Sequence, residues 1–209
     1  ITTSAIQMMG LMRETFREED HVRLHNVIRK AGDVINAVPD EAVIETKVRA
    51  ASLEAIRATQ EKIDRAYDGA AYAFGGKIKR EPLQGYMPVI HRGADEVMKE
   101  SVELLDATYR CSRPSDFNNA CTDVGDLTHL FPVLNFTFGG FEGKLHGADF
   151  QITDEELAYI KPAKLLALTI YHLLRDQAKE AKKICREFKP VFNKESYCRY
   201  IRDNFHENE

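Results

Sequence analysis

Two short segments decide the fold of the first part of the chain, HVRLHNVIR at residues 21–29 and AVIETKVRA at residues 42–50. Apolar residues occupy alternate positions in the first segment, at Val22 and Leu24, and both segments mix apolar with polar side chains. Because successive side chains of a strand point to opposite faces, this pattern predicts two half-buried strands. The turn-rich residues 30–40 lie between them, so the pair predicts a hairpin.

Helical patterns flank this hairpin. Apolar residues recur at helical spacing over residues 6–16, and a second helical stripe follows Ser52, a good N-cap, until Gly75-Gly76 ends it. Residues 77–83 read as a third strand. Residues 1–86 therefore predict the order helix, strand, strand, helix, strand, which is a ferredoxin-like α+β domain whose first strand is missing.

A second domain is predicted over residues 87–209, because proline and glycine residues cluster at the boundary. Its apolar spacing predicts an α/β arrangement in which helices alternate with an apolar strand and a glycine-rich loop. We expect a helix at 93–108, a strand at 130–138, a loop at 139–147, a long helix led by Pro162 after a Thr153–Glu156 capping box, and a final helix at 193–205.

Composition narrows the class of function. The 209 residues are 44% hydrophobic and carry a net charge of −4, which favours compact domains and gives no basic field for nucleic acid. No apolar run approaches the roughly 18 residues of a membrane helix, and no signal peptide pattern opens the chain. We therefore expect a cytoplasmic protein that binds neither nucleic acid nor membrane. Its four scattered cysteines are interpreted as reduced thiols.

Two segments of the second domain carry residues suited to chemistry. His146 stands in a glycine-bearing loop after an apolar run, and imidazole is a good zinc ligand, although a loop histidine bonded to backbone is the simpler interpretation. The run TDVGDLTH at residues 122–129 places two carboxylates and His129 in what reads as one turn. Such a cluster can orient a base or a ligand, or it can be ordinary turn chemistry.

The hairpin of the first domain carries two further candidates. Asn36 lies in the predicted turn, where its amide could bond a substrate carbonyl. Arg49 ends the second strand, where its guanidinium could hold a carboxylate or stabilise an oxyanion. The alternative for this pair is a turn asparagine and a surface arginine.

Several motifs, taken in chain order, resemble the zinc-dependent peptidases and amidohydrolases that include carboxypeptidase G, aminoacylase and aminobenzoyl-glutamate hydrolases. The resemblance rests on DVINAVPD at 33–40 with the VRA at 48–50, on TDVGDLTHLFP at 122–132, and on HGADF at 146–150 followed by PAKLLALT at 162–169. The aminobenzoyl-glutamate-utilization and aminoacylase-1-like-2 branch is the most similar, chiefly over residues 122–174.

This resemblance implies roles for four residues. His146 matches a metal ligand of the family, for zinc or another divalent metal such as manganese or cobalt. Asn36 and Arg49 match groups of the lid domain that reach a substrate or oxyanion across a homodimer, and His129 matches a group near the site. The family's other ligands and its glutamate base have no match here, so we expect residues 1–86 to be an incomplete lid and dimerisation domain and residues 87–209 the C-terminal part of the catalytic domain.

The sequence thus supports two hypotheses. The first is the C-terminal portion of a metal-dependent amidohydrolase or metallopeptidase that cleaves a small amide or peptide, and that is inactive without its N-terminal half because a catalytic zinc needs about three protein donors. The second is a non-catalytic dimerisation or interaction module derived from the same fold. Coding sequence upstream of Ile1 with the missing ligand motifs would distinguish them.

Overall fold

A computed structural model describes residues 1–83, 85–90, 95–105 and 121–205 of the chain. The chain forms two compact units. The first consists of Ile1–Val89 with the described residues of 121–126 and 195–205, and the second consists of the described residues between 90 and 105 together with 127–194. Both units mix helices with small antiparallel sheets, in agreement with the expected combination of helix and strand.

The first unit is built on the predicted hairpin. β1 (Arg23–Lys30) pairs antiparallel with β2 (Val43–Arg49), with Arg23 opposite Arg49 and an irregularity between Ile28 and Lys30. The predicted strands are confirmed to within two residues at each end. The loop between them carries exposed apolar side chains at Val34, Ile35 and Val38.

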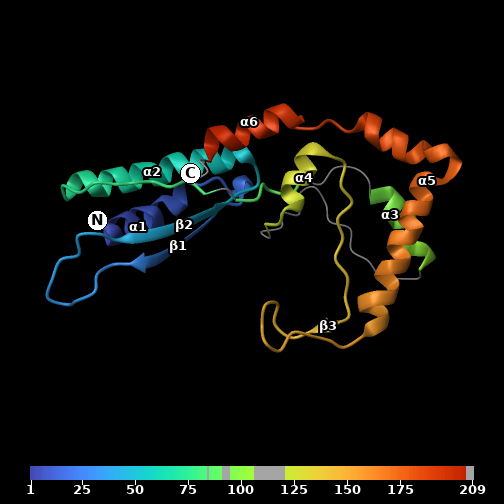
Figure 1. The fold of residues 1–209 in the computed structure, drawn as a ribbon, viewed down its shortest axis with the longest axis horizontal. Coiled ribbons are helices and arrows are strands. Elements are labelled where there is room, and N and C mark those ends of the chain that lie inside the picture. The colour runs from blue at the N-terminus through green and yellow to red at the C-terminus, as the bar shows by residue number, and fades with distance from the viewer. Residues whose placement is uncertain (84, 91–94, 106–120, 206–209) are drawn as a thin grey trace. The chain divides into compact units, whose positions relative to one another are not determined.

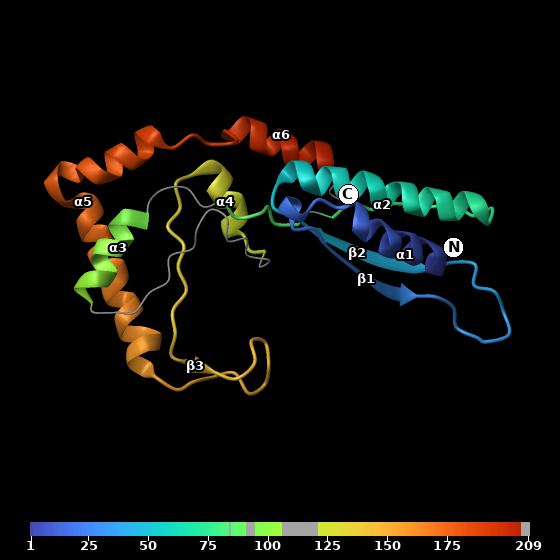
Figure 2. The same cartoon turned by 180° about the vertical axis from the view of Figure 1, so that it is seen from behind.

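Two helices pack beside this hairpin (Figure 1). α1 (Thr2–Leu11) starts earlier than expected, and its last predicted turn is the 3₁₀ helix η1 (Met12–Thr15), which a second one, η2 (Glu18–Asp20), follows. α2 (Leu53–Ala73) begins as predicted, because the Ser52 hydroxyl accepts a hydrogen bond from the backbone N–H of Ala55 at 3.1 Å. Seen from behind in Figure 2, α1 again runs alongside α2.

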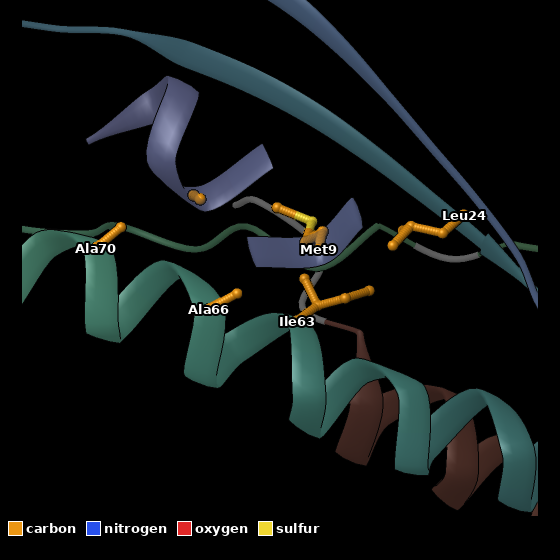
Figure 3. Close-up of a cluster of buried hydrophobic side chains, with 6 residues drawn as sticks. Met9, Leu24, Ile63, Ala66 and Ala70 are labelled. Atoms are coloured by element: carbon orange, nitrogen blue, oxygen red, sulfur yellow. The ribbon is translucent and has the colours of Figure 1, made fainter. Parts of the chain in front are cut away.

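The core of this unit lies where the two helices meet the hairpin (Figure 3). Met9 of α1, Leu24 of β1 and Ile63 of α2 converge there, each 1% exposed. Ala66 and Ala70 of α2 are buried on the same face, and such small side chains let two helix backbones approach closely. The sequence predicts an apolar stripe on this helix at Leu53, Ile56, Ile63 and Tyr67. Of these the structure buries Ile63, and the other three are only partly covered.

The predicted third strand at 77–83 is wrong. These residues form no regular strand, and the segment is held to α2 through side chains. Arg80 bonds Asp64 at 3.0 Å and Asp68 at 2.5 Å, and its hydrogen bond to Asp68 is the largest of the causes that raise the pKa of its guanidinium. Side-chain ion pairs therefore take the place of backbone pairing, and the part of the first domain that the structure describes has a two-stranded sheet.

The second unit is mainly helical. α3 (Asp95–Leu104) agrees with the predicted helix, whose ends at 93–94 and 106–108 lie outside the described residues. The long helix α5 (Lys161–Glu187) carries Pro162 in its first turn and is interrupted at Arg175–Ala178, where three residues adopt left-handed backbone angles.

A π-helical turn, η3 (Glu156–Ile160), precedes α5. The predicted capping residue Thr153 does not cap it, because Asp154 accepts the hydrogen bond from the backbone N–H of Leu157. The final helix, α6 (Lys194–Asn204), follows Asn193 as predicted and belongs to the first unit from Glu195 onward.

Two further predictions for this region are wrong. The sequence predicts a turn at 122–129 before a strand at 130–138. In the structure α4 (Val124–Leu130) is a helix, and residues 131–140 form no strand. Aromatic packing replaces strand pairing, since the rings of Phe136, Phe138 and Phe141 follow one another at 6.4 and 5.7 Å between centroids. The short hairpin of β3 (Phe141–Glu142) and β4 (Gln151–Ile152) comes later, with Phe141 opposite Ile152.

Candidate functional site

The structure separates the two candidates of the first unit. Asn36 lies exposed in the loop of the β1–β2 hairpin, whereas Arg49 is the last residue of β2 and half-buried. The first six residues of β2, Val43–Val48, stand between them, which at about 3.3 Å per residue amounts to roughly 20 Å. The two side chains therefore belong to opposite ends of the hairpin.

Asp126 and its neighbour Gly125 hold the start of α4 against Met87 within the first unit. One carboxylate oxygen of Asp126 accepts a hydrogen bond from Met87 N–H at 3.2 Å, and the other accepts from the Tyr197 hydroxyl at 3.0 Å. Gly125 leaves space for the Met87 carbonyl, which a Cβ at this position would strike. This carboxylate is thus committed to anchoring the backbone, which favours the turn-chemistry alternative for Asp126 over a base or ligand.

His129 is buried in the second unit, with 2% of the residue exposed. Its backbone carbonyl accepts hydrogen bonds from the N–H groups of Val191 and Phe192, at 2.9 and 3.2 Å. Its ring lies 6.2 Å from that of Phe192, tilted by 32°. These contacts show that His129 is packed among its neighbours. The predicted contact of His129 with substrate stays a prediction.

His146 occupies the middle of the loop that joins β3 to β4 and is exposed. The loop is closed by its own backbone, because Gly147 N–H bonds the Lys144 carbonyl at 2.6 Å and Asp149 accepts from Lys144 N–H at 3.3 Å. Stacked rings of Phe141 and Phe150, 5.3 Å apart, fix its two ends. The tight closure puts His146 itself at a left-handed φ of 65°, so its imidazole is presented to solvent from a constrained turn.

The donor set around this loop does not make a zinc site by itself. A protein zinc site takes three or four nitrogen, sulfur or oxygen donors. Over the described ranges, no group of three or more histidine, cysteine, aspartate or glutamate side chains is placed to hold a metal. His146 can contribute one donor, and the remaining ones would have to come from elsewhere.

A polar cluster between α3 and α5 was missed by the sequence reasoning. His172 is 6% exposed, with its Nδ1 3.0 Å from a carboxylate oxygen of Glu100, which Arg175 also contacts at 3.1 Å. Beside them the buried hydroxyls of Thr169 and Ser101 are 3.3 Å apart. Helical spacing places Thr169 and His172 on one face of α5, and this spacing was the available signal.

Two further observations concern the state of the cysteines and the presence of membrane-spanning helices. Cys185 and Cys198 are exposed free thiols, and Cys111 lies outside the described residues. Within the part of the chain that is described, no helix combines the length and apolar character needed to cross a membrane.

Comparison with known proteins gives one relative to report. No family model matches the chain. An N-acetyldiaminopimelate deacetylase from Pediococcus pentosaceus is 28% identical over 126 residues, which cover 57% of this chain and 32% of that protein. The similarity supports a relation to the broad amidohydrolase family. The chain matches only about a third of the length of this curated relative.

Proposed function

We propose that this chain is the C-terminal portion of a metal-dependent amidohydrolase that hydrolyses a small amide bond of the N-acyl or aminobenzoyl amino-acid type. The observation that carries the proposal is the 126-residue similarity to a deacetylase, an enzyme whose name describes hydrolysis of an N-acyl amino acid. The segments at 122–132 and 146–150, which resemble the same family, also support the proposal.

Four residues have roles in this proposal. His146 is a ligand of zinc, or of manganese or cobalt, presented by the constrained β3–β4 loop. Asn36 and Arg49 contact substrate from opposite ends of the lid hairpin, in a homodimer formed through the lid domain. His129 lies close to the site. Since one imidazole does not make a metal centre, the described residues catalyse no step alone, and we expect the isolated chain to be inactive.

The test is to express the chain with the polypeptide encoded directly upstream of Ile1 and to measure metal content and hydrolysis of N-acetyl and aminobenzoyl amino acids. We expect zinc-dependent hydrolysis from the pair and none from the chain alone. His146→Asn should lower the affinity for metal at least about tenfold. Asparagine tolerates the left-handed backbone at this position, so the loop should be preserved.

His21→Asn is the matched control. His21 is the other histidine with positive φ among the described residues, at 46°, and it lies exposed in the first unit. Its substitution should leave metal content unchanged. Equal metal content in the parent protein and the His146→Asn variant would contradict the proposed role of His146, and a pair that binds metal but cleaves no amide would contradict the proposed activity.

One observation favours the alternative of a non-catalytic interaction module. The β1–β2 hairpin exposes apolar side chains along its strands, with Val27 at 50%, Ile28 at 44% and Val43 at 42%. Exposed apolar strand residues are typical of surfaces that pair with another polypeptide. This alternative predicts pairing through the hairpin with no hydrolysis under any metal condition, and the same expression experiment decides between the two.

A further inference from the structure

We propose that α5 alternates between the broken helix of this structure and one continuous right-handed helix over Lys161–Glu187. We call Arg175–Ala178 the α5 break, and Figure 1 shows α5 changing direction part-way along its length. The whole element belongs to the second unit. The motion therefore lies within that unit and is independent of the proposed activity.

The backbone of the α5 break is strained. Asp176, Gln177 and Ala178 have φ of 53°, 57° and 58°, with ψ of 46°, 35° and 37°, which is a left-handed helical run. Residues other than glycine adopt this conformation singly and not in runs, because it brings each Cβ close to the following carbonyl oxygen. Three such residues in succession store strain that a right-handed helix would release.

The sequence of the break favours a right-handed helix. LLRDQAKEA at residues 173–181 contains neither proline nor glycine, and arginine, glutamine and alanine are good helix formers. In a continuous helix Asp176 would stand three residues before Lys179, a spacing at which opposite charges attract. Sharp helix kinks usually coincide with proline or glycine. The cause of this bend is therefore to be sought in tertiary contacts and not in the local sequence.

The contacts that hold the broken form are exposed. The Arg175 guanidinium donates to a carboxylate oxygen of Glu100 in α3 at 3.1 Å, and the Lys182 ammonium donates to the Gln177 carbonyl at 2.9 Å. Exposed charge contacts contribute little to stability and weaken further in salt. Strained backbone persists where its surroundings fix it, but Arg175, Asp176 and Gln177 are all exposed. The broken and continuous forms therefore lie close in free energy.

The Arg175–Glu100 pair links the state of the break to α3. Glu100 belongs to α3, which contacts the first half of α5 through the Ser101 and Thr169 hydroxyls. The pair favours the broken form for as long as Glu100 stays within reach of Arg175. Salt, or any group that competes for Glu100, shifts α5 toward the continuous helix and changes the direction of residues 179–187.

Pulsed electron double resonance on the full chain measures the two forms. Spin labels are placed at Cys185 and at Tyr171→Cys, both exposed positions, and the other three cysteines are replaced by serine. A continuous helix places these two Cα atoms about 21 Å apart, at about 1.5 Å per residue, and the bend shortens that distance. We expect both distances in the parent protein.

Substitutions in the break should change the ratio of the broken to the continuous form. Ala178→Gly should raise it at least about fivefold, because glycine tolerates a left-handed backbone and weakens a right-handed helix. Arg175→Gln should lower it about two- to fivefold, since it removes the pair with Glu100 and keeps the helix propensity. About 1 M sodium chloride should act in the same direction.

Ala181→Gly is the matched control. Residue 181 lies outside the break and is right-handed helix in either form, so the ratio should stay nearly unchanged. The same distance distribution in the parent, Ala178→Gly and Arg175→Gln proteins would overturn the proposal, whichever form it shows. A shift of the Ala178→Gly protein toward the longer distance would overturn it as well. An equal response to Ala181→Gly would refute the special role of the break.

Discussion

At the scale of single residues, Gly125 and Asp126 belong to a motif that the sequence suggested as a functional site, and both have a structural role. Asp126 uses both carboxylate oxygens to hold Met87 and Tyr197. Gly125 allows this, since a side chain there would meet the Met87 carbonyl, whose carbon lies 2.8 Å from the position of a Cβ. The glycine is therefore required by the close approach of two backbones within the first unit.

This contact predicts the effect of adding one methyl group. Gly125→Ala should destabilise the protein by about 1–3 kcal/mol, because backbone has to move to relieve the clash. Gly69→Ala is the control, since Gly69 lies exposed within α2 with nothing within 4 Å of a Cβ. It should stabilise the protein by roughly 0.5–1 kcal/mol. Urea unfolding measures the free energy of unfolding of each variant and of the parent. Equal stability of the Gly125→Ala variant and the parent would contradict the close approach of Gly125 to the Met87 carbonyl.

At the scale of elements, α6 packs on α2 through an aromatic ring and a cation. The guanidinium carbon of Arg57 in α2 lies 5.5 Å from the centroid of the Tyr200 ring in α6. Burial raises the pKa of the Tyr200 phenol, the Arg57 charge lowers it, and the Asp126 charge raises it, with a net upward shift. The pKa of this phenol is therefore sensitive to the Arg57 charge of α2.

Removing the cation should raise the pKa of Tyr200 further. In Arg57→Gln the opposing charge is gone while burial remains, so phenolate forms at higher pH than in the parent. Because the folded-state pKa is raised, the stabilisation is complete below the unfolded pKa of about 10 and is lost as pH rises through the folded value. The ultraviolet absorbance difference between each protein and its Tyr200→Phe counterpart isolates this titration. A fall of the pKa in Arg57→Gln would show that the helices are not packed in this way.

At the scale of the whole molecule, the division into two compact units means that damage to one core need not reach the other. Met9, Leu24 and Ile63 are drawn from three elements of the first unit and are almost fully buried. The α3–α5 contact of the second unit shares none of these residues. The two units should therefore respond separately to substitutions.

Ile63→Ala should lower the free energy of unfolding of the first unit by about 2–5 kcal/mol, through lost burial and a cavity. Hydrogen exchange followed by mass spectrometry should show faster exchange in α1, α2 and the β1–β2 hairpin, with α3 and α5 unchanged. Leu11→Ala is the control within the same unit, because Leu11 is 79% exposed and fills no core space. Faster exchange throughout the chain would instead indicate a single cooperative unit.

Local patterns in the sequence were enough to predict most of the helices and strands of the first unit. Alternation and turn residues identified the hairpin, and Ser52 with Gly75-Gly76 bounded α2, because a hairpin and a capped helix satisfy their backbone hydrogen bonds mainly within themselves. The same holds for α6 after Asn193. For the site, glycine-bearing sequence indicated the loop around His146, though not its left-handed backbone.

The sequence by itself determined the helices and the hairpin whose backbone hydrogen bonds form between residues near each other in the chain. It also indicated, through its motifs, a relation to amidohydrolases, and the similarity to the deacetylase supports that relation at the level of the broad family. Only the tertiary structure decided that residues 77–83 and 130–138 are not strands, since a strand exists only where another backbone pairs with it. It also decided that Asn36 and Arg49 lie at opposite ends of a hairpin and that Asp126 is an anchor. The physical reason is common to all of these: pairing, separation and burial are relations between residues distant in the chain, which local spacing does not encode.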